Sequence, residues 1–137
     1  MPASSPDNQL DPCPLCGEQQ SVPFHRDRRD YLQCGACRLV FVPPAQRLDA
    51  AAEKAEYDLH ENHPADTGYR CFLSRLADPL IKRLPAASRG LDFGCGPGPT
   101  LSLMLEEAGH RVDLYDRFYA DEAAVFGRHY DFITATE

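Results

Sequence analysis

The sequence lacks any long apolar run: hydrophobic residues make up 43% of its 137 positions but occur only a few at a time. A transmembrane helix needs about 20 consecutive apolar residues, so none is predicted. Residues Met1 to Leu10 also lack the basic and apolar parts of a signal peptide. We therefore expect a cytoplasmic protein that does not interact with membranes.

Positive charge is scarce as well. The chain has 14 Lys and Arg against 21 Asp and Glu, which gives a formal net charge of −7. Most of the excess lies in residues 90–137, which hold nine acidic residues against three basic ones. Proteins that bind nucleic acid through a general basic field carry the opposite balance. The charge therefore disfavours nucleic acid, or any large anionic molecule, as a partner.

Cysteine, by contrast, is abundant, and four of the six cysteines form two CxxC pairs with 17 residues between them. A disulfide framework would need an oxidising compartment. A redox dithiol would need its pair at the start of a helix after a strand, and neither pair is placed so. Two CxxC turns at this spacing are typical of tetrahedral zinc. We predict one structural Zn²⁺ bound by Cys13, Cys16, Cys34 and Cys37.

With four thiolates around the metal, His25, which lies between the two pairs, is left for packing or the surface. Four arginines, Arg26, Arg28, Arg29 and Arg38, give the same region a modest basic character. They alternate with acidic residues. We interpret these arginines as part of a solvated loop of mixed charge. The alternative is that they contact an anionic substrate.

Composition divides the chain into three segments. Residues 11–44 contain the cysteine pairs and form the expected zinc ribbon, which Pro43-Pro44 closes. Residues 45–88 are expected to form a helical connector or lid. Residues 89–137 alternate strand, glycine loop, helix and strand, a pattern that predicts a parallel sheet. The predicted fold class is α/β: a zinc ribbon, then helices, then a parallel sheet.

Individual elements follow from hydrophobic patterning and turn residues. Strands are predicted at 21–25, 31–34, 39–42, 90–93, 112–116 and 130–134. Helices are predicted at 49–59, 69–84 and 100–108. Pro79 lies inside the second of these helices and should kink or break it, because proline lacks an N–H and clashes with the preceding turn.

The glycine-rich loop Gly94-Cys95-Gly96-Pro97-Gly98 follows the predicted strand at 90–93. Its glycines allow a sharp turn and a close approach of the backbone to a ligand. A dinucleotide fingerprint needs its third glycine at position 99, which is Pro99, so a nicotinamide-dependent oxidoreductase is disfavoured. Asp116 ends the next strand, 22 residues after Gly94, where a carboxylate can accept hydrogen bonds from both ribose hydroxyls.

These motifs make residues 89–137 similar to the first half of a class I S-adenosylmethionine-dependent methyltransferase. The stretch LDFGCGPG resembles the first motif of that family, VDLYD the second, and YDFITATE the start of its fourth-strand motif. With the cysteine pairs, the chain from about residue 11 resembles zinc-ribbon-bearing methyltransferases. The resemblance implies that the parallel sheet is an incomplete Rossmann-like sheet. It also implies S-adenosylmethionine as cofactor and an unidentified acceptor, either a small molecule or a macromolecule.

The resemblance also implies roles for individual residues. The backbone of Gly94, Cys95 and Gly96, in the loop that Gly98 completes, would line the methionine and ribose parts of the cofactor. Asp92 would orient the loop and face the cofactor's amino group. Asp116 would hold the ribose. Phe118 or Tyr119 would pack on the adenine.

The catalytic residues are unknown from the sequence. The chemistry alone makes Tyr57, His60, Tyr69 and Glu137 candidates for a general base. A surface or packing role is the simpler interpretation of each. The mechanism that the resemblance implies needs little more than alignment of the acceptor with an already activated methyl group.

Two features depart from the family pattern. Only 14 residues separate Asp116 from Asp131, where the family has a helix, a strand and another helix, so the usual adenine-binding acid is missing. The sequence also ends at Glu137, after the third predicted strand of a sheet that normally has seven. We expect either the N-terminal part of a longer protein, prone to self-association, or a sheet that another chain completes. The alternative function is a non-catalytic zinc-ribbon scaffold with an inactive methyltransferase half.

Overall fold

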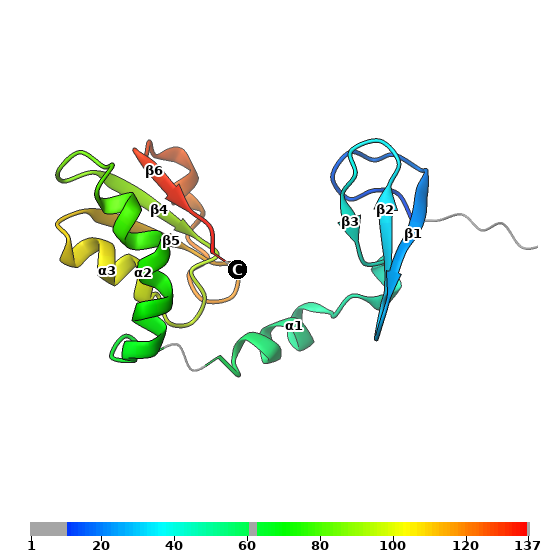
Figure 1. Ribbon diagram of the computed structural model, residues 1–137, viewed down its shortest axis with the longest axis horizontal. Coiled ribbons are helices and arrows are strands. Elements are labelled where there is room, and N and C mark those ends of the chain that lie inside the picture. Colours follow the sequence, from blue (N-terminus) through cyan, green and yellow to red (C-terminus); the bar gives the residue numbers. More distant parts are fainter. Residues whose placement is uncertain (1–10, 61–62, 137) are drawn as a thin grey trace, which may run out of the picture. The chain divides into compact units, whose positions relative to one another are not determined.

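The computed structural model describes residues 11–60 and 63–136 (Figure 1). The chain divides into two units between Asp49 and Ala50. The first contains an antiparallel sheet and the second a parallel sheet with helices. The α/β fold class is therefore confirmed. Among the described residues, no helix has the length and apolar character needed to cross a bilayer.

The first unit is built on three antiparallel strands in the order β1-β2-β3. They span Ser21–Arg26, Asp30–Cys34 and Val40–Phe41, followed by the 3₁₀ helix η1 at Pro44–Gln46. These strands overlap the three predicted from the sequence. Their buried core is small: Cys13, Leu32, Cys34 and Phe41, with Leu39 packed against them. A core of this size contributes little stability, so the unit needs a further crosslink.

The second unit contains a parallel sheet with strand order β5-β4-β6. Its strands are β4 (Arg89–Phe93), β5 (Arg111–Tyr115) and β6 (Phe132–Thr134). Its helices are α1 (Ala50–Tyr57), α2 (Thr67–Ile81) and α3 (Thr100–Glu107), with the 3₁₀ helix η2 at Ala123–Gly127. β4, α3 and β5 form the predicted strand–helix–strand unit.

Helix α2 begins at a side-chain cap and ends close to a proline. The Asp66 carboxylate accepts hydrogen bonds from the backbone N–H groups of Gly68 (2.8 Å) and Tyr69 (3.0 Å), in the first turn of the helix. The helix runs through Pro79 and ends at Ile81. The predicted break is thus confined to the last turn, where a proline removes few helical hydrogen bonds.

One face of the parallel sheet packs against α2 and α3. Leu73 and Ala77 from α2, together with Leu101 and Leu105 from α3, bury Phe132 of β6 against the sheet. The opposite face carries Phe93, Tyr115 and Ile133, which the strand register places on one side. Phe126 of η2 packs on Tyr115 with ring centroids 4.6 Å apart, while Ile133 stays 65% exposed. The core thus lies on the helical side of the sheet.

The short stretch between β5 and β6 contains no third parallel strand within the described residues. It holds an isolated bridge between Asp116 and Ala120, and then η2. The Glu122 side chain caps η2 by accepting a hydrogen bond from the N–H of Ala124 (3.1 Å). The loop after Asp116 therefore turns back on itself directly beside the ends of the strands.

A substitution at Gly90 tests the packing of Phe132 against the sheet. A Cβ atom at Gly90 would fall inside the contact distance of the Phe132 ring. We expect Gly90→Ala to lower the free energy of unfolding by about 1–3 kcal/mol, the usual cost of overpacking a core, in urea titrations followed by circular dichroism. Gly127→Ala is the matched control, because nothing lies within 4 Å of its added Cβ. Equal effects of the two substitutions would contradict this packing.

Candidate functional site

The loop after β4 turns through two left-handed residues. Gly94 and Gly96 have φ angles of +75° and +67°, which a residue with a side chain adopts only under strain. The N–H groups of Gly94 and Cys95 both donate to the carbonyl oxygen of Tyr115, at 2.8 and 3.2 Å. These bonds tie the glycine loop to the end of β5 and leave it wrapped around the carboxyl ends of both strands.

Asp116 links this loop to the next one. Its Oδ2 accepts a hydrogen bond from the N–H of Gly96 (3.1 Å). Its Oδ1 accepts from the N–H groups of Phe118 (2.8 Å) and Tyr119 (3.2 Å). An ionised carboxylate has about four acceptor positions, so these three bonds leave capacity for a ligand.

Asp92 lies buried beneath the loop, with only 2% of its surface exposed. The hydroxyl of Thr134, on the neighbouring strand β6, donates to its Oδ1 at 2.7 Å. Burial raises the pKa of Asp92, and the hydrogen bond from Thr134 offsets part of the rise. Burial, together with the charges of Asp92 and Asp116, also raises the pKa of the Cys95 thiol to about 11. Cys95 is therefore a protonated thiol at neutral pH and a poor nucleophile.

A cavity of about 420 Å³ opens beside the loop, at the carboxyl ends of the strands. In open parallel sheets ligands bind at this edge. Of the predicted residues, Gly94, Cys95, Gly96, Asp116 and Phe118 line the cavity. Asp92, Gly98 and Tyr119 are not part of its wall. Three of the four candidate bases, Tyr57, His60 and Tyr69, also line it, and Glu137 falls outside the described residues.

Some wall residues were not found from the sequence. Phe93, Pro97, Tyr115 and Arg117 are immediate neighbours of the motif residues. Phe72 is one helical turn from Tyr69, and their rings stack with centroids 6.4 Å apart. Adjacency and helical spacing were the available signals for these residues, but they do not show which side chains face a ligand.

Helix α1 forms one wall of the cavity and is attached to the loop after Asp116. The Tyr119 hydroxyl donates to Asp58 at 2.5 Å, and Arg117 pairs with Glu53 at 3.6 Å. The Lys54 ammonium lies over the Tyr119 ring, 4.9 Å from its centroid. Lys54 and Tyr119 together hold the pKa of Asp58 below its usual value. Burial and the bond to Asp58 raise the pKa of Tyr119 to about 12, so the phenol remains a donor at neutral pH.

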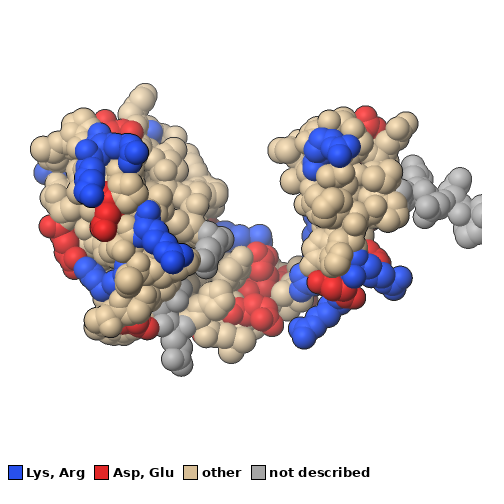
Figure 2. All heavy atoms as spheres, viewed as in Figure 1, with Lys and Arg blue, Asp and Glu red and all other residues tan. Residues whose placement is uncertain are grey.

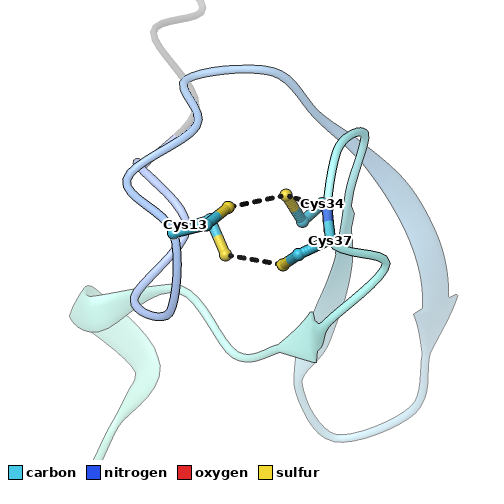
Figure 3. A group of neighbouring side chains, drawn as sticks. Cys13, Cys34 and Cys37 are labelled. Atoms are coloured by element: carbon cyan, nitrogen blue, oxygen red, sulfur yellow. Dashed lines mark hydrogen bonds between the residues drawn. The ribbon is translucent and has the colours of Figure 1, made fainter.

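The four predicted cysteine ligands come together in the first unit. Their sulfur atoms all lie within 4.8 Å of one another, and the Cys13–Cys37 and Cys16–Cys34 pairs are each 3.6 Å apart. Figure 3 shows Cys13, Cys34 and Cys37 turned toward a common centre. A disulfide would bring two sulfurs to about 2.05 Å. Tetrahedral zinc with bonds of about 2.3 Å requires sulfurs about 3.8 Å apart, so the cluster fits this metal.

The cysteines of this cluster differ in pKa: burial and the neighbouring cysteine sulfurs outweigh a backbone hydrogen bond and raise the pKa of the Cys37 thiol to about 12, whereas a backbone hydrogen bond favours the thiolate form of Cys34. The N–H of Cys37 donates to the Cys34 sulfur at 3.4 Å and lowers the pKa of that thiol to about 6. His25 lies outside the cluster and packs against Tyr31, with ring centroids 5.8 Å apart. The group that comes together thus consists of four sulfurs and does not include the imidazole of His25.

The surface charge of the first unit is mixed. Arg26 pairs with Asp30 at 3.2 Å while its side chain remains 83% exposed. On the face that Figure 2 shows, basic side chains lie at both ends of the unit, each time with acidic side chains near them. Such an arrangement forms no continuous basic field for a polyanion.

In a comparison with protein families, a family model described as "Methyltransferase domain" aligns with residues 65–137. The match covers more than half of the chain, and includes α2, the glycine loop, Asp116 and β6. No curated protein matches the chain.

The buried carboxylate of Asp92 makes a test of its environment possible. Because burial raises its pKa, ionised Asp92 lowers the stability of the folded state as the pH rises from about 4 through that raised value. We expect Asp92→Asn to be more stable than the wild type near pH 7. The difference should shrink to nothing below about pH 4, where both side chains are neutral.

Urea titrations across this pH range measure the difference, and Asp121→Asn, at an exposed position, serves as the control. A wild-type protein that is more stable than Asp92→Asn at pH 7 would show that the ionised carboxylate is stabilised in the fold. That result would contradict the conclusion that burial affects the pKa of Asp92 more strongly than the hydrogen bond from Thr134 does.

Proposed function

The chain belongs to the methyltransferase domain family, and on that premise we propose that it transfers a methyl group from S-adenosylmethionine to an acceptor. One observation carries the proposal: the glycine loop and Asp116 face the same cavity at the carboxyl ends of parallel strands. The cavity is within the size range of small-ligand sites. The limits 11–44, 45–88 and 89–137 for ribbon, connector and Rossmann-like domain remain predictions.

In this proposal the chain holds the cofactor mainly through its backbone. Gly94, Cys95 and Gly96 bring main-chain groups close to the methionine and ribose parts, because left-handed glycines leave no side chain in the way. Asp116 accepts hydrogen bonds from the ribose hydroxyls with its remaining acceptor capacity. Asp92 supports the loop from below with a negative charge that favours the cofactor's ammonium group.

The sulfonium of S-adenosylmethionine supplies a methyl group that needs no further activation. The chain then contributes alignment and exclusion of bulk water. Aromatic side chains suit the exclusion of water, since Tyr57 and Phe118 lie on one side of the cavity, with ring centroids 6.3 Å apart, and Phe72 is on another. The acidic residue that binds adenine in the family is missing from this chain. We propose that Phe118 packs against the adenine instead.

We further propose that the four cysteines hold a structural zinc ion. Four thiolates saturate a tetrahedral metal and leave no open position for catalysis. The metal would supply the crosslink that the four-residue core of this unit lacks.

Isothermal titration with S-adenosylhomocysteine, the product of the cofactor, tests the main proposal. We expect one site per chain, and about 10- to 100-fold weaker binding to Asp116→Asn, the loss expected when a hydrogen bond to a charged group is removed. Asp121→Asn, five residues away and exposed, should bind like the wild type. Absence of binding to the wild type, with its zinc content intact, would refute the function.

Elemental analysis tests the metal. Protein purified without chelators should contain about one zinc per chain, and Cys34→Ser should lose it because three thiolates remain. Cys71→Ser, which changes an exposed cysteine of α2, should keep the metal. Zinc-free wild-type protein, or zinc retained in Cys34→Ser at the wild-type level, would contradict the proposed site.

A further inference from the structure

Helix α1 presents a row of side chains to the cavity. Glu53, Tyr57 and His60 are spaced at i, i+4 and i+7, which places them along one side of a helix and its C-terminal extension. All three line the cavity, as does the glycine loop. The N–H of His60 donates to the carbonyl oxygen of Tyr57 at 3.0 Å, so the helical course continues to His60. Its imidazole lies edge-on to the Tyr57 ring, with centroids 6.0 Å apart.

Two attachments hold this row in place. The Glu53–Arg117 ion pair anchors the beginning of the helix, and the Asp58–Tyr119 hydrogen bond anchors it two residues before His60. Both partners belong to the loop that follows Asp116, and the N–H of Tyr119 itself donates to Asp116. The position of His60 is thereby coupled to the residue that we propose holds the ribose.

The two carboxylates in the described part of the cavity wall already have partners in the chain. The carboxylate of Glu53 is paired with Arg117, and Asp116 already accepts three backbone hydrogen bonds. Cys95 holds its proton, since burial and the two nearby aspartates raise its pKa to about 11.

Three phenols complete the titratable groups of the described cavity wall: Tyr57, Tyr69 and Tyr115. Phenols ordinarily ionise near pH 10 and are protonated at pH 7. Imidazole is the side chain that changes its protonation state near neutral pH. Within the described lining residues, His60 is the only imidazole.

We propose that His60 is a catalytic base that takes the proton lost by the methyl acceptor. The inference rests on the proposed function. It restricts the acceptor to molecules whose nucleophilic atom carries a hydrogen that must leave, such as a hydroxyl oxygen or an N–H nitrogen. The O–H or N–H bond breaks as the new bond to the methyl carbon forms. The proton passes to the imidazole of His60, and the electron pair of the methyl–sulfur bond stays on sulfur.

The test needs no acceptor, because the cofactor and its product differ in charge at sulfur. S-adenosylmethionine carries a positive sulfonium, and S-adenosylhomocysteine a neutral thioether. If His60 faces the reacting methyl group, the sulfonium must disfavour the imidazolium. At roughly 6 Å, and between the dielectric of water and that of a protein surface, the pKa of His60 should be about 0.5–2 units lower with S-adenosylmethionine.

NMR spectra of the full zinc-loaded chain, with histidine labelled at Cε1, give this pKa directly from titrations in each complex. The resonance of His60 is assigned by its loss in His60→Asn. The other four histidines, His25, His63, His110 and His129, lie outside the cavity wall and serve as controls in the same spectra. Their pKa values should agree between the two complexes.

Equal pKa values of His60 in the two complexes would overturn the proposal, as would a difference at His63 in place of His60. Either result would leave the proposed function standing, because both ligands would be bound. If calorimetry shows that neither ligand binds, the proposed function fails and the role of His60 fails with it.

Discussion

The carboxylate of Asp116 is the interaction on which the second unit depends. Its two oxygens connect the glycine loop, through Gly96, to the loop that carries Phe118 and Tyr119. Without this acceptor, three backbone N–H groups at the mouth of the cavity would lose their partner. The same carboxylate has capacity left for a ligand, so one residue both builds the site and faces its contents.

Helix α1 depends on that loop in turn. Helix α1 has eight residues, and a helix this short is unstable in water by itself. None of its residues is buried, so packing against a core does not stabilise it. Its contacts with Arg117 and Tyr119 compensate for the missing core. Because the loop is ordered by Asp116, the wall that carries His60 is ordered indirectly by the residue that we propose binds the cofactor. Binding and catalysis would then share one network of hydrogen bonds.

The sequence predicted the features that depend on local chemistry. The glycine loop, Asp116 and the two CxxC turns were found because their spacing reflects backbone geometry, and the strands because apolar patterning is local. The position of Tyr119 could not be found in this way. The resemblance leaves either Phe118 or Tyr119 to pack on the adenine, and it gives no sign that the Tyr119 hydroxyl donates to Asp58, 61 residues earlier in the chain. Contacts of this range depend on how elements pack, and hydrophobic periodicity does not encode them. The same limit kept Phe72 and Thr136 out of the predicted site.

The most direct test of the account is the map of amide chemical shifts in ¹H–¹⁵N NMR spectra as S-adenosylhomocysteine is added. We expect the largest changes at the N–H groups of Gly96 and Phe118, which donate to Asp116, and at those of Gly94 and Cys95, which donate to the carbonyl oxygen of Tyr115. Amides of the cysteine cluster should stay unchanged. Changes that are absent from the glycine loop, or that gather in the first unit, would contradict the assignment of this cavity as the methyltransferase site.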